Sequence, residues 1–209
     1  MRLFGHRAAR DRYAALAGAG GLAPGQTILE MEPGKGALTD GLLPLVAERG
    51  ELILQQPAAL DAFFGARARR RAERAPNARY AAASWEALDA GDGTVDRVLW
   101  VQGPHELWFK RILGRPSRVF AEIARVLAPD GRFLVVDNMA PPHVSDARAG
   151  DLHRSNPRTV AALARDTGLA PLREDIDWVG APHDPRTVPT YDRATKGKPW
   201  QWLQVWQRS

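Results

Sequence analysis

Residues 27–39 of the chain read Thr-Ile-Leu-Glu-Met-Glu-Pro-Gly-Lys-Gly-Ala-Leu-Thr. Thr27–Met31 is mostly apolar or β-branched and predicts a short strand, and the turn-forming run from Glu32 to Gly36 follows it at once. A helical pattern begins at Ala37, so this stretch predicts a strand, a tight loop and a helix. In open α/β sheets such a loop lies outside the carboxyl end of its strand, where nucleotide-like ligands bind.

Two familiar phosphate-binding loops do not match this stretch. The strict G-x-G-x-x-G fingerprint fails because Thr39 occupies the place of its third glycine, and Glu32 lies two residues before Gly34. The Walker-type loop fails because Gly36, rather than serine or threonine, follows Lys35.

Strand and helix patterns alternate along the rest of the chain. We expect strands at Thr27–Met31, Glu51–Gln55, Arg79–Ala82, Val95–Val101, Arg132–Asp137, Leu172–Trp178 and Trp202–Gln207. We expect helices at Ala37–Glu48, Ala58–Arg74, Trp85–Ala90, Ser117–Leu127 and Pro157–Thr167. This alternation predicts an α/β fold of three layers, with a mostly parallel sheet covered by helices on both faces.

Length and composition indicate one globular domain. The chain has 209 residues, of which 44% are hydrophobic and 25% charged, so it is long and apolar enough to bury a core. The sequence has no cysteine, which excludes disulfides, thiolate metal sites and cysteine nucleophiles. No apolar run of membrane-spanning length occurs, and Met1–Arg12 lacks the apolar core of a secretory signal, so we expect a cytoplasmic protein without a membrane partner.

The chain is basic, with a net charge of +5, and only four of its 29 basic residues are lysine. The densest cluster comprises Arg67, Arg69, Arg70, Arg71 and Arg74. Alanines interrupt this cluster and no aromatic residues are interleaved for base stacking, so we interpret it as a solvated helix face and do not expect a nucleic-acid partner. Phosphate binding, with recruitment of RNA, is the alternative.

Three blocks of sequence resemble the class I S-adenosylmethionine-dependent methyltransferases. They are Ile28–Thr39, Asp96–Leu99 and Arg125–Asp137, and their order and separations match as well as their residues. The resemblance covers about residues 25–207. His153-Arg154, His183–Thr187 and Lys196–Trp202 are similar to the C-terminal region of a bacterial group of uncharacterised predicted methyltransferases.

The resemblance implies a Rossmann-like fold with a seven-stranded sheet, a reversed C-terminal hairpin and S-adenosylmethionine (SAM) as cofactor. It implies a methyltransferase-like domain over 25–209, and we expect a separate N-terminal helical segment over 1–24. The cofactor-binding residues that it implies are Glu30, Glu32, Gly34, Gly36, Gln55, Ser84 and Gln102. A small molecule is the substrate that we expect, and a homodimer is an open possibility.

Three of these positions depart from the family pattern. In the family, an acidic residue at the position of Gln55 usually binds the ribose hydroxyls, and an acidic residue at the position of Ser84 often binds the adenine amino group. Glu32 replaces the first glycine of the family's loop. A neutral amide can still bind a hydroxyl, but without the stronger charge-assisted geometry. A methyltransferase-fold protein without methyl transfer, serving as a binding or scaffold module, is therefore the alternative.

The polar run Gln102–Glu106 follows the fourth expected strand and would face the cofactor's methyl group. His105 is our candidate catalytic base, because an imidazole titrates near neutral pH; the alternative is a structural histidine that caps the next helix. Asp137 could orient the substrate or cap its loop. Another set, His143, Asp151, His153, His183 and Asp184, has no familiar ligand spacing, so we expect no metal site. The proline-rich segment Gly180–Lys198 is either a lid over the substrate or a packed connection.

Overall fold

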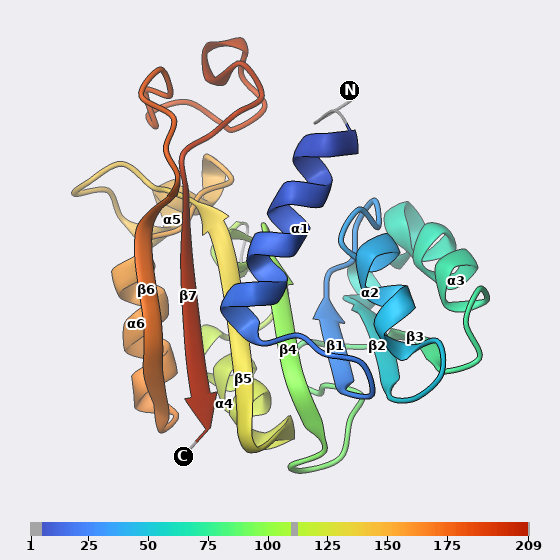
Figure 1. Ribbon diagram of the computed structural model, residues 1–209. Helices are drawn as coiled ribbons and strands as arrows, with labels where there is room; N and C mark the ends of the chain where they lie inside the picture. Colours follow the sequence, from blue (N-terminus) through green and yellow to red (C-terminus); the bar gives the residue numbers. More distant parts are fainter. Residues whose placement is uncertain (1–5, 110–112, 209) are drawn as a thin grey trace.

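The computed structural model describes residues 6–109 and 113–208 (Figure 1). Its helices are α1 (His6–Gly20), α2 (Thr39–Val46), α3 (Ala66–Ala72), α4 (Pro116–Val126), α5 (Asp146–Asp151) and α6 (Pro157–Asp166). Its strands are β1 (Thr27–Met31), β2 (Glu51–Gln56), β3 (Ala78–Ala82), β4 (Val95–Val101), β5 (Leu127–Asn138), β6 (Leu169–Val179) and β7 (Gln201–Arg208). Short helical turns are η1 (Ala58–Leu60), η2 (Asp61–Gly65), η3 (Pro104–Leu107) and η4 (Arg193–Thr195).

The seven strands form one sheet in the order β3-β2-β1-β4-β5-β7-β6. Pairing is parallel from β3 to β5, and β7 runs antiparallel to both of its neighbours, β5 and β6. The predicted mostly parallel sheet with a reversed C-terminal hairpin is therefore confirmed. Because β1 and β4 are neighbours although β2 and β3 lie between them in sequence, the strand order reverses beside β1, which is where α/β sheets bind ligands.

Apolar side chains on the two faces of the sheet build two cores. On one face α1, α2 and α3 pack through residues such as Leu16, Leu42 and Ala72. On the other face α4 and α6 pack through residues such as Phe120 and Val160. Figure 1 shows these helices as layers in front of and behind the strands, which confirms the three-layer prediction.

Several helix predictions need correction. Trp85–Ala90 is a series of turns, because its backbone groups bind distant side chains: Leu88 N–H donates to Glu122 and Asp89 N–H donates to Gln55. The helix expected over Ala58–Arg74 is divided into η1, η2 and α3, and the one expected from Ala37 begins at Thr39. Helix α5, which begins at a Ser145 cap, was not predicted.

None of the described helices combines the length and the apolar character needed to cross a membrane.

Candidate functional site at the carboxyl edge of the sheet

The loop after β1 has an unusual backbone. Glu32, Gly34 and Gly36 have φ angles of 56°, 51° and 76°, so alternate residues of the loop are left-handed. Glycine adopts this region freely, whereas another L-residue pays roughly 1–2 kcal/mol for it. Glu32 therefore keeps the backbone of a glycine-rich loop at the cost of local strain, which is typical of functional sites.

Glu30 stabilises the two ends of this loop. Its carboxylate is buried at the end of β1 and accepts a hydrogen bond of 2.7 Å from the hydroxyl of Thr39, the first residue of α2. Burial raises the pKa of Glu30 to about 7, although the Thr39 hydroxyl opposes that rise. The side chain thus ties the strand before the loop to the helix after it.

Glu32 directs its carboxylate across the edge toward the end of β4. A Cβ on Gly103 would lie 2.5 Å from Glu32 Oε2, so the missing side chain at 103 leaves the room that this carboxylate occupies. Oε2 has no hydrogen-bond partner of good geometry among the described residues. Burial raises the pKa of Glu32 to about 8; the Glu106 and Asp137 carboxylates add to the rise and His105 opposes it.

The two glutamines that end β2 have different surroundings. Gln55 Nε2 donates to the carbonyls of Ser84 at 2.9 Å and Ala87 at 3.3 Å, and its Oε1 accepts from Asp89 N–H at 2.8 Å. Gln56 is also fully buried, yet neither polar atom of its side chain has a partner among the described residues. The amide of Gln55 is thus occupied by the β3–β4 connection, whereas that of Gln56 is buried without a hydrogen-bond partner among the described residues.

Ser84 and Gln102 lie on the same edge as these glutamines. The Ser84 hydroxyl accepts from Glu86 N–H at 3.0 Å, and its carbonyl accepts from Gln55. Gln102 follows β4 with a φ of 59°, and its N–H donates to the Val136 carbonyl at 2.7 Å. Both residues therefore contribute to the loops of this edge.

His105 lies in η3 and is held by Asp137 at the end of β5. Its Nδ1 lies 2.9 Å from Asp137 Oδ1, and its backbone N–H donates to Oδ2 at 2.9 Å. Asp137 also accepts from the Ser155 hydroxyl at 2.6 Å and from Asn138 N–H at 2.8 Å. This buried carboxylate fixes the ring and leaves Nε2 turned to the other side.

Two further side chains meet His105 on that side. Nε2 lies 3.3 Å from His153 Nδ1 and 3.5 Å from Glu106 Oε1. Burial lowers the pKa of His105, but Asp137 and Glu106 outweigh it and raise that pKa to about 10. Burial lowers the pKa of His153, and the charge of His105 adds to this. The His105 ring is accordingly protonated at neutral pH when no other cation offsets the carboxylates.

The β6–β7 connection is anchored beside this cluster. Arg154 and Asp184 have fully buried side chains and form two hydrogen bonds of 2.8 Å. Asp184 also accepts from the N–H groups of Arg186 and Trp200, and the Tyr191 ring lies 5.5 Å from that of His153. Figure 1 shows the connection projecting above β6 and β7. Its base is packed, and one of its aromatic residues reaches the site.

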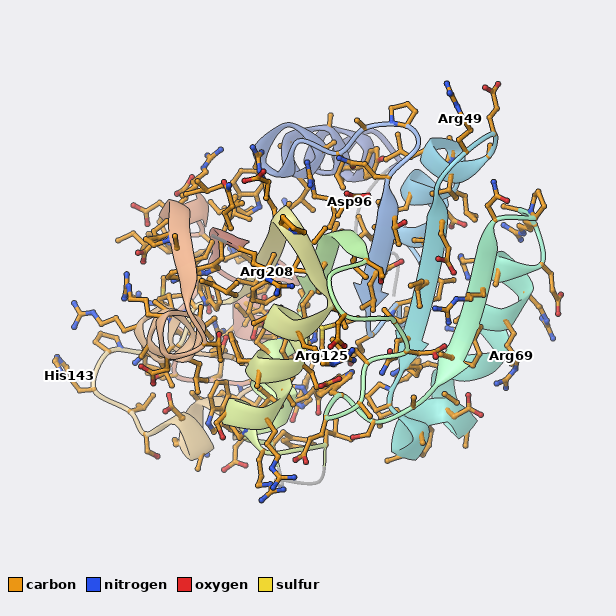
Figure 2. All side chains as sticks on the ribbon, turned by 90° about the horizontal axis from the view of Figure 1, so that it is seen from below. Arg49, Arg69, Asp96, Arg125, His143 and Arg208 are labelled. Carbon is orange, nitrogen blue, oxygen red and sulfur yellow. The ribbon has the colours of Figure 1, made fainter. Side chains whose placement is uncertain are left out.

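The structure does not gather the histidine and carboxylate set that the sequence singled out in its C-terminal half. Asp184 pairs with Arg154, and His183 Nε2 lies 3.0 Å from the Thr195 carbonyl. Figure 2, seen from below, shows His143 on an outlying loop with its side chain pointing away from the molecule. Of that set, His153 alone reaches His105 and Glu106.

The arginine cluster is partly neutralised by carboxylates. Arg71 forms hydrogen bonds of 2.9 and 3.0 Å to Asp40, and Arg69 lies 2.8 Å from Asp61. Figure 2 shows Arg69 on the outer side of α3. An open pocket of about 290 Å³ is lined by Lys35, Arg67, Arg70, Arg71 and Arg74.

Sequence reasoning gave no role to Gln56, named Glu106 only within the polar run Gln102–Glu106, and considered His153 as a site residue only in a metal-ligand set that it rejected. Gln56 and Gln55 are adjacent and chemically identical, so the sequence carries no signal that separates them. Glu106 follows His105 directly in sequence, and this adjacency could have indicated that the two side chains share a site. His153 lies 48 positions further along the chain, and the fold alone brings it to His105.

Residues 33–135 match a family model described as a methyltransferase domain. No curated protein matches the sequence.

Solved structures share the whole fold at low sequence identity. A SAM-dependent methyltransferase from Aquifex aeolicus superposes with a TM-score of 0.66 at 14% identity, covering 99% of this chain and 100% of that one. Geranyl diphosphate C-methyltransferase from Streptomyces coelicolor, in complex with Mg²⁺, geranyl diphosphate and S-adenosyl-L-homocysteine, gives 0.67 at 14% identity over 98% and 82% of the two chains. A SAM-dependent methyltransferase from Mesorhizobium loti gives 0.64 at 15% identity over 93% and 96%.

Proposed function

We propose that the chain is a class I SAM-dependent methyltransferase and that it methylates a small molecule held against the His105, Glu106 and His153 side chains. The cofactor lies at the ends of β1 and β2 in this proposal, and the acceptor at the ends of β4 and β5. Both places are at one edge of the sheet, so the two reactants meet beyond the strand β4.

One observation supports this proposal above the others. The buried side-chain atoms without a hydrogen bond of good geometry in the described part of the chain belong to Glu32, Gln56, Trp85 and Trp100. Of these, Glu32 and Trp100 face each other beside Gly103, and the Trp100 indole N–H lowers the pKa of Glu32. All four residues end or follow one of the strands β1 to β4 at the carboxyl edge. Native proteins rarely leave buried polar atoms unpaired, so such a concentration indicates a polar ligand at this edge.

The chemistry of these atoms fits SAM. The Glu32 carboxylate suits the ammonium group of the methionine part, and the Gln56 amide can both donate to and accept from the ribose hydroxyls. Gly34 leaves open space beside the loop, where a Cβ would find only the Glu32 carbonyl within 4 Å, at 3.8 Å. When bound, SAM supplies an electrophilic methyl group on a sulfonium.

His105 remains the proposed catalytic residue, in contact with the acceptor. The carboxylate of Asp137 orients its ring, so that Nε2 faces the acceptor side. With its pKa raised to about 10, the free ring donates a hydrogen bond to the acceptor rather than removing its proton.

Calorimetric titration with SAM and with S-adenosylhomocysteine tests the proposal directly. We expect both ligands to bind with one site per chain and to raise the unfolding temperature, because a ligand that binds only the native state stabilises it. Gly34→Val should abolish binding, because a branched side chain would fill the open space and valine disfavours a φ of 51°.

Absence of binding of either ligand at millimolar concentration would contradict the proposal and favour a scaffold role for the fold. Bound cofactor or product in the purified protein would argue strongly against that role. The cytoplasmic location and the narrower bacterial group stay predictions.

A further inference from the structure

His105, Glu106 and His153 bring three potential metal-binding atoms together at the acceptor side of the site. His105 Nε2 lies 3.3 Å from His153 Nδ1 and 3.5 Å from Glu106 Oε1, and the last two atoms are 3.8 Å apart. Two ligand atoms that each lie about 2.0–2.1 Å from a tetrahedral zinc ion are about 3.3–3.4 Å apart. The three interatomic distances therefore allow one shared ion, once the side-chain atoms move by a few tenths of an ångström.

The residues around His105 orient its ring in the way that metal-coordinating histidines are usually oriented. The Asp137 carboxylate is hydrogen-bonded to Nδ1 of His105, so the lone pair of Nε2 points toward His153 and Glu106. Asp137 is itself fixed by the Ser155 hydroxyl at 2.6 Å. A carboxylate behind a histidine, itself hydrogen-bonded, is the usual outer support of a metal-binding imidazole.

The charge around these atoms favours a cation. Three buried or half-buried carboxylates, Glu32, Glu106 and Asp137, face two imidazole rings. Within the described residues, these carboxylates are not paired with a lysine or arginine. Among the described residues, the protonated ring of His105 offsets part of this negative charge, and a divalent ion would offset more of it.

One side of the cluster is open. The exposed fraction of the side chain is 5% for His105, 15% for Glu106 and 27% for His153. The rings of Phe109 and Tyr191 lie 4.8 and 5.5 Å from that of His153. Three protein ligands with an accessible fourth side are typical of catalytic rather than structural metal sites.

We propose that His105 Nε2, His153 Nδ1 and Glu106 Oε1 bind a divalent transition-metal ion, with one coordination position left open toward the acceptor. Two imidazoles and one carboxylate suit Zn²⁺, Fe²⁺ or Co²⁺ better than Mg²⁺ or Ca²⁺, which prefer oxygen ligands. With the ion bound, His105 Nε2 is a metal ligand and no longer contacts the acceptor directly. That the open position receives an oxygen atom of the acceptor rests on the proposed function; metal binding itself does not. This inference replaces the expectation of no metal site.

Cobalt is the probe, because Co²⁺ in a four- or five-coordinate site absorbs visible light far more strongly than the hydrated ion. Untagged full-length protein is treated with a chelator, dialysed and titrated with Co²⁺. We expect intense visible bands that saturate at one ion per chain and are abolished by Zn²⁺ in competition. Elemental analysis of the untreated protein should find the native metal.

Variants separate this site from incidental binding. Glu106→Gln and His153→Ala should each weaken Co²⁺ binding at least 100-fold, and Ser155→Ala about 10-fold, since an outer partner has a smaller effect than a ligand. His143→Ala is the matched control, because that histidine lies on an outlying loop, and it should bind as the unmodified chain does. Circular dichroism with thermal unfolding checks that each variant is folded.

The spectrum of hydrated Co²⁺ alone, or equal binding by His153→Ala and His143→Ala, would overturn the proposal. SAM binding is measured on the same metal-free protein by calorimetry. A chain that binds SAM but no Co²⁺ refutes the metal site and leaves the proposed function intact. A chain that binds Co²⁺ but no SAM supports the metal site and contradicts the proposed function.

Discussion

Gln55 and Gln56 are adjacent and identical in type, yet of the two only the Gln55 side chain has hydrogen-bond partners among the described residues. Gln55→Leu removes hydrogen bonds to the β3–β4 connection and leaves its buried groups unpaired, so we expect the free energy of unfolding to fall by about 2–4 kcal/mol. Gln56→Leu removes an amide without partners in the described residues, so the change should stay below about 0.5 kcal/mol. SAM affinity should nevertheless fall about tenfold, because the ligand loses its amide contact.

Urea denaturation and calorimetry measure both quantities. Gln207→Leu is the matched control, because that side chain binds Asp130 near the opposite end of the sheet. The assignment is wrong if Gln56→Leu binds SAM as tightly as the control does.

At the scale of elements, the long β6–β7 connection depends on one buried ion pair. Asp184→Asn would leave the Arg154 guanidinium buried without its counter-charge, which costs about 3–5 kcal/mol. We expect this variant to unfold at lower urea concentration and to be cleaved by proteases within 180–198. Asp192→Asn, which alters an exposed cap of η4, should cost less than about 1 kcal/mol.

Limited proteolysis followed by mass analysis maps the cleavage sites in both variants, with and without SAM. Protection of Pro182–Thr195 by the ligand would support the lid interpretation. Equal cleavage with and without SAM would leave the segment as a packed connection, and indistinguishable behaviour of the two variants would contradict the anchoring role of Asp184.

For the whole molecule, the net charge of +5 raises the question of a nucleic-acid partner. Asp40 and Asp61 already offset part of the arginine cluster, so we expect no retention of mixed RNA in filter binding at physiological salt. The triple variant Arg67→Ala, Arg70→Ala and Arg74→Ala should behave as the unmodified chain does, in RNA retention and in SAM binding. Retention that falls steeply with salt and disappears in the triple variant would instead make the pocket beside Lys35 a phosphate-binding surface.

The order and type of the strands were predictable because each strand carries its own apolar pattern. The apolar runs of β1 and β4, and the run of β7 that is apolar on both faces, can be recognised within a few residues. Trp85–Ala90 was not predictable in this way, because its backbone bonds are made by Gln55 and Glu122, which lie more than 30 positions away. Local propensity is overridden where distant side chains satisfy the backbone.

Short-range patterns in the sequence encode the α/β class and the loop at Glu32–Gly36, and they predict a ligand at that edge of the sheet. Which of the described side chains at this edge have hydrogen-bond partners depends instead on the tertiary structure. It separated Gln56 from Gln55 and joined His153 to His105. The physical reason is that a parallel sheet brings the ends of its strands and their loops together regardless of their distance along the chain, whereas hydrogen bonding and burial depend on what lies within a few ångströms.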